Sequence, residues 1–293
     1  MNNQYVIVSD ATLDLPMKII DEFDIKVIPM MIEIDGKEYT HYPDEREFTT
    51  EEFYRKIKEG SVSHTSQITP AAFMTYFEEI LKKGQDILYI AFSSGLSGTY
   101  HSALIAIEEL KEEYPERKMY CIDSLCASIG EGYLVYQAAV KKQEGYGIDD
   151  LRQWVEDNKR KVRHWFSVND LLYLKRGGRV TSLEAVFGTA LKIKPVLSTD
   201  ACGKLVVEEK VRGSNGEMAL FINKIKTEGI DVSSQTIFIG HGNNLKQAKK
   251  LEKLIRDKNL VKDIIICDVG PIIGTHTGPG ILAAVFMGEN GEL

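Results

Sequence analysis

Residues 93–100, SSGLSGTY, place hydroxyl side chains and two glycines between an apolar run and a predicted helix. The run before them, residues 86–92, is typical of a buried strand. Gly95 and Gly98 permit a tight turn and a close approach of a ligand to the backbone. The first amides of a helix lack partners and carry partial positive charge. Ser97 is therefore expected either to cap the helix or to bind an anion with its hydroxyl.

A second polar cluster is SHTSQITP, residues 63–70, which lies just before another predicted helix. Thr65, Ser66 and Gln67 are short donors, and Pro70 suits the first turn of a helix. Alone, this pattern is also typical of a loop with helix caps. Because ligands of α/β proteins bind beyond the carboxyl ends of strands, the two clusters together favour a shared anion site.

Two more segments carry groups that could meet an anion. In KRGGRVTS, Arg179 follows a Gly-Gly turn. A guanidinium in this setting can bind an oxyanion. The alternative is that this charged run simply forms solvated surface. In GPIIGTHTGPGI, His276 lies among glycines and prolines between apolar strands. We expect His276 on an exposed loop, where it is either structural or in contact with a carboxylate.

The order of elements predicts an α/β protein of two domains, each a mostly parallel sheet flanked by helices. At 293 residues the chain is long for one core, and the domains are expected at 1–160 and 161–293. Residues 27–34 are expected to form one strand, and residues 182–191 a helix.

Composition limits the class of ligand. A net charge of −7 without a basic stripe disfavours nucleic acid and makes a small ligand the better hypothesis. No zinc spacing is seen, so no cofactor or metal is predicted. The N-terminus lacks the pattern of a signal peptide and no apolar run could span a bilayer, which predicts a cytoplasmic protein. The four cysteines are interpreted as buried apolar residues: Cys121, Cys126, Cys202 and Cys267.

An enzyme remains an alternative. The segment GLSGT differs by one residue from the G-x-S-x-G nucleophile elbow, with Thr99 in place of the second glycine. Ser97 would then be the nucleophile and His276 its base, in an esterase or thioesterase. The G-x-x-x-x-G-K-[ST] loop of nucleotide hydrolases is absent from the sequence.

Seven segments in order resemble the DegV family of bacterial lipid-binding proteins, over essentially the whole chain. They are VIVSDATLDLP, HTSQ, SSGLSGTY, KRGGRV, LKIKPVL, EEKVR and GTHTGPG. In the first of them, Ala11 replaces a serine of the family pattern, which leaves the role of that loop in ligand contact open.

The resemblance implies a non-catalytic protein that holds one long-chain fatty acid, such as palmitate, with its head group in the interdomain cleft. An ATP-dependent fatty acid kinase subunit would phosphorylate the bound carboxylate, and transient contact with a membrane surface is compatible with this role. A lipid-sensing regulatory protein is the other alternative. The resemblance assigns the carboxylate to Thr65, Ser97 and His276, supported by Ser66, Gly98, Arg179 and Arg212.

Overall fold

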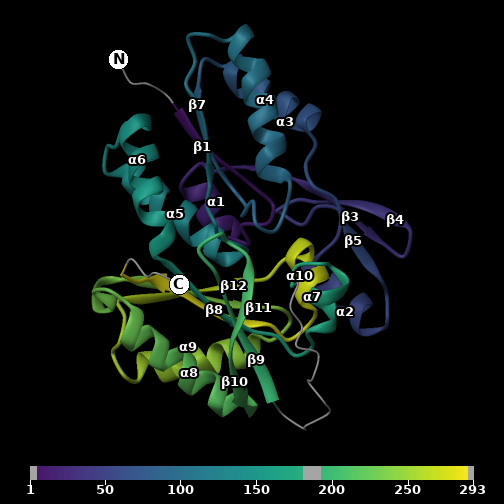
Figure 1. Ribbon diagram of the computed structural model, residues 1–293, viewed down its shortest axis with the longest axis vertical. Helices are drawn as coiled ribbons and strands as arrows, with labels where there is room; N and C mark the ends of the chain where they lie inside the picture. Colours follow the sequence, from purple (N-terminus) through teal and green to yellow (C-terminus); the bar gives the residue numbers. More distant parts are fainter. Residues whose placement is uncertain (1–4, 181–192, 290–293) are drawn as a thin grey trace.

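The first half of the chain contains a parallel sheet covered by helices on both faces, as predicted. The computed structural model describes residues 5–180 and 193–289, and Figure 1 shows this sheet in the upper part of the molecule. Its strand order is β2-β1-β6-β7, and all three pairings are parallel. The strands are β1 (Tyr5–Asp10), β2 (Lys26–Ile28), β6 (Asp86–Ala91) and β7 (Met119–Asp123).

Alternate residues of these strands pack against different helices. Ile7 and Leu88 belong to the core that contains α5, while Val8 and Tyr89 belong to the core formed with α3 and α4. This alternation follows from the two-residue period of a strand. The helices of this half are α1 (Met17–Glu22), α2 (Thr50–Lys58), α3 (Pro70–Leu81), α4 (Thr99–Glu113), α5 (Ile129–Gln143) and α6 (Ile148–Asn158).

A small antiparallel sheet interrupts this arrangement, and the prediction of one strand over 27–34 is wrong. The chain leaves the parallel sheet after β2 and starts β3 at Met30, with Pro29 between them. Proline has no N–H to donate to a ladder, so a strand pairing ends there readily. The new sheet has the order β4-β3-β5, from β3 (Met30–Ile34), β4 (Lys37–His41) and β5 (Ser63–Thr65).

The second half is also α/β, but its sheet is mixed, which corrects the expectation of a mostly parallel one. The strand order is β10-β9-β8-β13-β11-β12, and four of its five pairings are antiparallel. A short turn joins β9 to β10, which forces a hairpin. Only β11 and β12, which are joined through helix α9 (Leu245–Arg256), are paired in parallel. The strands are β8 (Val162–Ser167), β9 (Ile193–Thr199), β10 (Leu205–Arg212), β11 (Thr236–His241), β12 (Asp263–Asp268) and β13 (Leu282–Met287).

Helices α8 and α9 cover the outer face of this sheet (Figure 1). The helix expected over 182–191 lies outside the described residues. The predicted boundary at residue 160 falls in a short 3-10 turn, η1 (Lys159–Lys161), directly before β8. The remaining helical elements are α7 (Leu172–Arg176), α8 (Gly213–Glu228), η2 (Val232–Ser234), α9 (Leu245–Arg256) and α10 (Pro271–Thr277).

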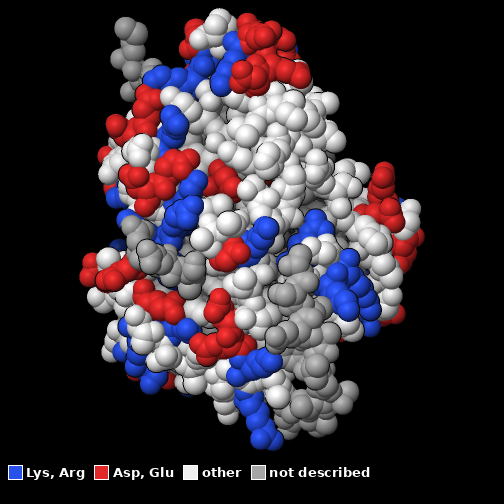
Figure 2. Space-filling view, in the orientation of Figure 1, with Lys and Arg blue, Asp and Glu red and all other residues white. Residues whose placement is uncertain are grey.

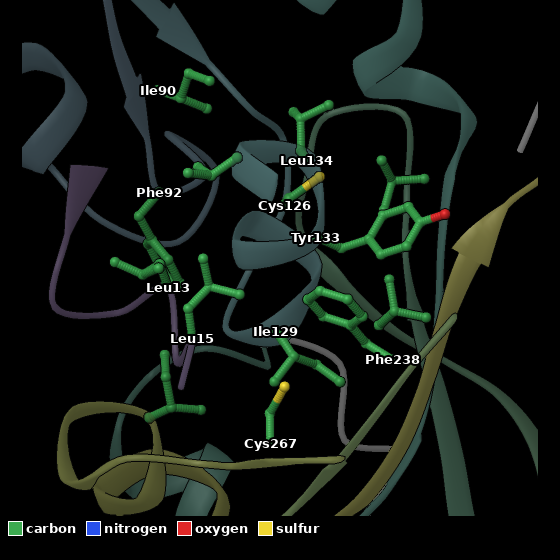
Figure 3. Packing of buried hydrophobic residues seen from close by; sticks show 14 of the residues in the cluster. Leu13, Leu15, Ile90, Phe92, Cys126, Ile129, Tyr133, Leu134, Phe238 and Cys267 are labelled. Carbon is green, nitrogen blue, oxygen red and sulfur yellow. The ribbon is translucent and has the colours of Figure 1, made fainter. Parts of the chain in front are cut away.

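Helix α5 joins the two halves through a continuous buried core. Figure 3 shows Ile129 and Tyr133 of α5 between residues of the opening segment, such as Leu13, and residues of the second sheet, such as Phe238. The rings of Tyr133 and Phe238 meet edge to face, with centroids 5.1 Å apart. Because one core contains residues of both domains, their relative placement is fixed by apolar packing.

Charged side chains of both signs are interspersed on the face shown in Figure 2. No single-sign stripe is visible on that face. None of the helices in the described part of the chain has the length and apolar character of a membrane span.

Candidate functional site

A cavity of about 300 Å³ lies between the two domains. This volume is at the lower end of the range typical of small-molecule sites, roughly 300–1,000 Å³. Its apolar wall comes from both halves and includes Met30, Phe92, Leu96, Ile129, Phe166, Leu174, Leu205, Ile273, Ala283 and Val285. Its polar wall includes Thr12, Thr65, Ser66, Gln67, Ser97, Ser128, His164, Arg179, Thr199 and His276.

Thr65 and His276, which are 211 residues apart in the sequence, meet at this cavity. Thr65 ends β5, and its Oγ1 lies 2.8 Å from Nε2 of His276. His276 is on α10, a short helix that begins at Pro271, and its side chain is half-buried. The expectation of an exposed loop is therefore wrong: the proline starts a helix, and Gly278, at φ +69°, ends it only after His276.

His276 is neutral near pH 7. Burial, with smaller effects from the charges of Arg179 and His64, lowers the pKa of His276 to about 4. A neutral ring carries one N–H and one lone pair. Nε2 contacts Thr65, whereas Nδ1 is buried and has no hydrogen-bond partner among the described residues. His276 can thus hydrogen-bond a ligand or orient the Thr65 hydroxyl, but it adds no positive charge.

Ser97 stands at the entrance of α4. The N-cap position belongs to Gly98, and Ser97 Oγ accepts from the Thr99 amide at 3.2 Å. It also lies 3.0 Å from the Thr99 hydroxyl. Ser97 therefore satisfies one amide of the first turn and also lines the cavity, while its binding of an anion stays a prediction.

The two polar segments predicted to share an anion are in contact. Gln67 Nε2 donates to Ser102 Oγ in α4 at 3.2 Å. A Cβ at Gly98 would overlap Oε1 of Gln67, so a larger residue at this position would displace the end of the Gln67 side chain. Gly98 lines the cavity, and its supporting role stays a prediction. Ser66 also lines the cavity, although its side chain is exposed.

The structure brings one of the two predicted arginines to the cavity. Arg179 lines it, donates from Nε to the Leu96 carbonyl at 3.3 Å and donates from Nη1 to the Gly177 carbonyl. Burial lowers the pKa of Arg179, but a guanidinium stays charged at neutral pH. Arg179 is the one lysine or arginine among the described lining residues.

The structure does not bring Arg212 to the cavity. Arg212 is the last residue of β10 and is exposed. Leu205, the first residue of β10, does line the cavity. Arg212 lies seven residue steps beyond Leu205 along the strand, about 23 Å at roughly 3.3 Å per step. The order of motifs in the sequence could not reveal this separation.

The opening loop contributes residues that the sequence did not single out. Ala11 is 3% exposed and does not line the cavity, whereas Thr12 does. Thr12 Oγ1 lies 2.5 Å from Asp10 Oδ1 and 2.8 Å from Glu131 Oε2. One hydroxyl hydrogen cannot serve two carboxylates, so one acid must hold a proton. Burial raises the pKa of both Glu131 and Asp10, but Asp10 accepts hydrogen bonds from the Thr12 amide, the Thr12 hydroxyl and the Tyr89 hydroxyl, which favour its charged form and leave the proton on Glu131.

An apolar cavity with convergent hydrogen-bond donors is typical of α/β proteins that bind small amphipathic molecules. The chain matches the family model described as "Uncharacterised protein, DegV family" over residues 4–289, and it belongs to that family.

Relatives and solved structures match along almost the whole chain. A DegV domain-containing protein of Clostridium perfringens is 42% identical over 289 residues, which cover 99% of each chain. The structure titled for fatty acid binding of a DegV family protein from Thermus thermophilus is 27% identical, with a TM-score of 0.87 and coverage of 97% of this chain and 99% of that one. DegV of Bacillus subtilis, named as a fatty acid binding protein, is 27% identical with a TM-score of 0.82, covering 98% of this chain and 100% of that one.

Replacing Arg179 with glutamine should raise the pKa of His276 from about 4 toward the value near 6.5 of a free histidine. The positive charge of Arg179 disfavours a second cation beside it, and the substitution removes that charge. NMR titration of the imidazole signals measures the change. His164 is the internal control, because its low pKa comes from burial and Arg163. An unchanged pKa of His276, or an equal rise in the pKa values of His276 and His164, would contradict the effect assigned to the charge of Arg179.

Proposed function

We propose that this protein binds one long-chain fatty acid, with the carboxylate held by Thr65, Ser97 and His276 and the acyl chain along the apolar wall. One observation carries the proposal: a single cavity joins these three polar residues to apolar side chains from both domains. Thr65 and Ser97 supply hydroxyl donors, and His276 acts through Thr65 by donating from Nε2 to its Oγ1, which leaves the Thr65 hydrogen free for the carboxylate. The two elements touch through Gln67 and Ser102.

The two ends of the ligand have different energetic roles. Burying a methylene yields roughly 0.8 kcal/mol, so a sixteen-carbon chain could supply on the order of 10 kcal/mol before ordering costs. A carboxylate buried without partners would lose several kcal/mol of hydration. Hydroxyls at a helix entrance and the charge of Arg179 offset that loss. In this account the tail provides affinity and the head group sets orientation.

The comparisons support a lipid ligand, since several similar structures are titled as fatty acid binding proteins. We propose further that the chain acts in the cytoplasm as the acyl-carrying partner of an ATP-dependent fatty acid kinase and has no turnover alone. Fixed donors around the head group would hold one carboxylate oxygen toward the partner. A purely lipid-sensing role would use the same cavity, and co-purification with a kinase subunit distinguishes the two.

The contacts of His276 favour a binding protein over an esterase. A serine nucleophile needs a histidine base that is itself oriented by a third group. Here Nε2 of His276 contacts Thr65, and Nδ1 has no carboxylate or other partner among the described residues. The Ser97 hydroxyl contacts Thr99 instead. Labelling of Ser97 by a fluorophosphonate would support the esterase.

Ser97→Ala should weaken palmitate binding about tenfold or more, because a hydrogen bond to a charged group contributes about 1.5–3 kcal/mol. Displacement of a fluorescent fatty acid at equilibrium measures the affinity. Ser94→Ala is the matched control: Ser94 is in the same loop, but its hydroxyl bonds to Asp123 Oδ2 at 2.5 Å. Equal affinities of the Ser97 variant and the parent would remove Ser97 from the head-group site.

Incubation of the purified protein with ATP and palmitate should yield no acyl phosphate until a fatty acid kinase subunit is added. The described polar wall offers donors for a carboxylate but no nucleotide loop. Trapping with hydroxylamine followed by mass spectrometry detects the product. Acyl phosphate formed by the protein alone would refute the carrier role while leaving fatty acid binding intact.

A further inference from the structure

A second polar pair lies in the cavity wall, on the sheet of the second domain. His164 of β8 and Thr199 of β9 both line the cavity, and His164 Nδ1 lies 3.1 Å from Thr199 Oγ1. Their neighbours in the sheet are apolar lining residues, since His164 pairs with Val285 and Thr199 with Leu205. A hydrogen-bonding pair in such a wall is costly unless its donors are used.

This pair has one more donor hydrogen than the described residues use. His164 is 6% exposed, and burial, aided by Arg163, lowers its pKa to about 4, so the ring is neutral and carries one N–H. If Nδ1–H donates to Thr199, the Thr199 hydroxyl hydrogen is left over. If Thr199 donates to Nδ1, then Nε2–H is left over, and Nε2 has no partner among the described residues. Either tautomer leaves one donor without an acceptor.

The imidazole is held in place by its surroundings. A Cβ at Gly130, in the first turn of α5, would overlap Nε2 and Cδ2 of His164, so the ring fills the space that a side chain would take. The ring is thus wedged between α5 and the sheet. Fixed polar groups of this kind set which ligands fit, because they lose little entropy on binding.

The pair lies on β8 and β9 of the second sheet, whereas the residues proposed for the head group lie on β5, on α10 and at the entrance of α4. His276 is on α10, and the chain runs from there through Ile281 into β13. Ile281, Ala283 and Val285 all line the cavity. Val285, the residue paired with His164, is four residues beyond Ile281, about 13 Å at roughly 3.3 Å per residue. An acyl chain that runs along Val285 and Leu205 therefore passes His164 and Thr199.

We propose that His164 and Thr199 form a specificity site for a fatty acid whose acyl chain carries an oxygen substituent, a hydroxyl in particular. This inference rests on the proposed function. The substituent oxygen accepts the spare hydrogen of the pair, which satisfies its one free donor. A plain acyl chain leaves the pair unsatisfied. Sites built to hydrogen-bond a ligand hydroxyl discriminate strongly against analogues that lack it.

Competition binding of stearic acid and its positional monohydroxy isomers tests this inference. In the parent protein we expect one isomer, with its hydroxyl opposite the pair, to bind at least as tightly as stearic acid. The Thr199→Val substitution keeps the shape of the side chain but removes its hydroxyl. In this variant the affinity for that isomer should fall about tenfold relative to the affinity for stearic acid. Thr199→Ser keeps the hydroxyl and should retain the preference.

Ser97→Ala provides the matched control, because loss of a head-group contact should weaken all these ligands by a similar factor and leave their ratio unchanged. Thermal melting of each variant confirms that it is folded. The specificity site is refuted if every isomer binds more weakly than stearic acid by the same factor in the parent and in Thr199→Val. Failure of stearic acid itself to bind the folded parent would instead refute the proposed function.

Discussion

The packing of α5 against both sheets is the contact on which the cavity depends. Tyr133 and Ile129 of this helix join the core of the opening segment to that of the six-stranded sheet (Figure 3). Helix α10 makes a second contact between the halves, since Ile272 packs in the core that contains α2, α3 and α4, and Thr65, Ser97 and His276 line a common space. A site made from three distant segments is only as well defined as the core that holds them.

The polar wall is almost uncharged, which suits the burial of a single anion. Arg179 is the only lysine or arginine lining the described cavity, and burial keeps His276 neutral. Glu131 is likewise neutral behind Thr12, because its raised pKa keeps it protonated. Hydroxyls and a neutral imidazole can hydrogen-bond a carboxylate without attracting other anions as strongly as a cluster of cations would. Orientation, rather than net charge, is then what these groups provide.

The sequence predicted the features that depend on local residue patterns or on the family resemblance. Hydroxyls at helix entrances predicted Thr65 and Ser97, which both line the cavity, and the α/β class and the DegV family are confirmed. The sequence did not predict the pairing of strands that are distant along the chain. In the second sheet, β13 lies antiparallel between β8 and β11.

Local errors had local causes. Pro29 divides one apolar run between two sheets, and the glycines around His276 concealed a helix that begins with a proline. The His164–Thr199 contact was invisible for another reason, because the two residues meet only through the pairing of β8 with β9. Neither residue has neighbours in the sequence that mark a ligand site.

Native mass spectrometry of the purified protein, followed by denaturation and identification of released lipid, tests the central claim most directly. If the cavity between the domains holds an acyl chain, the intact protein should carry one fatty acid per chain, and denaturation should release it. Protein that remains free of lipid after incubation with palmitate, while still folded, would contradict the account.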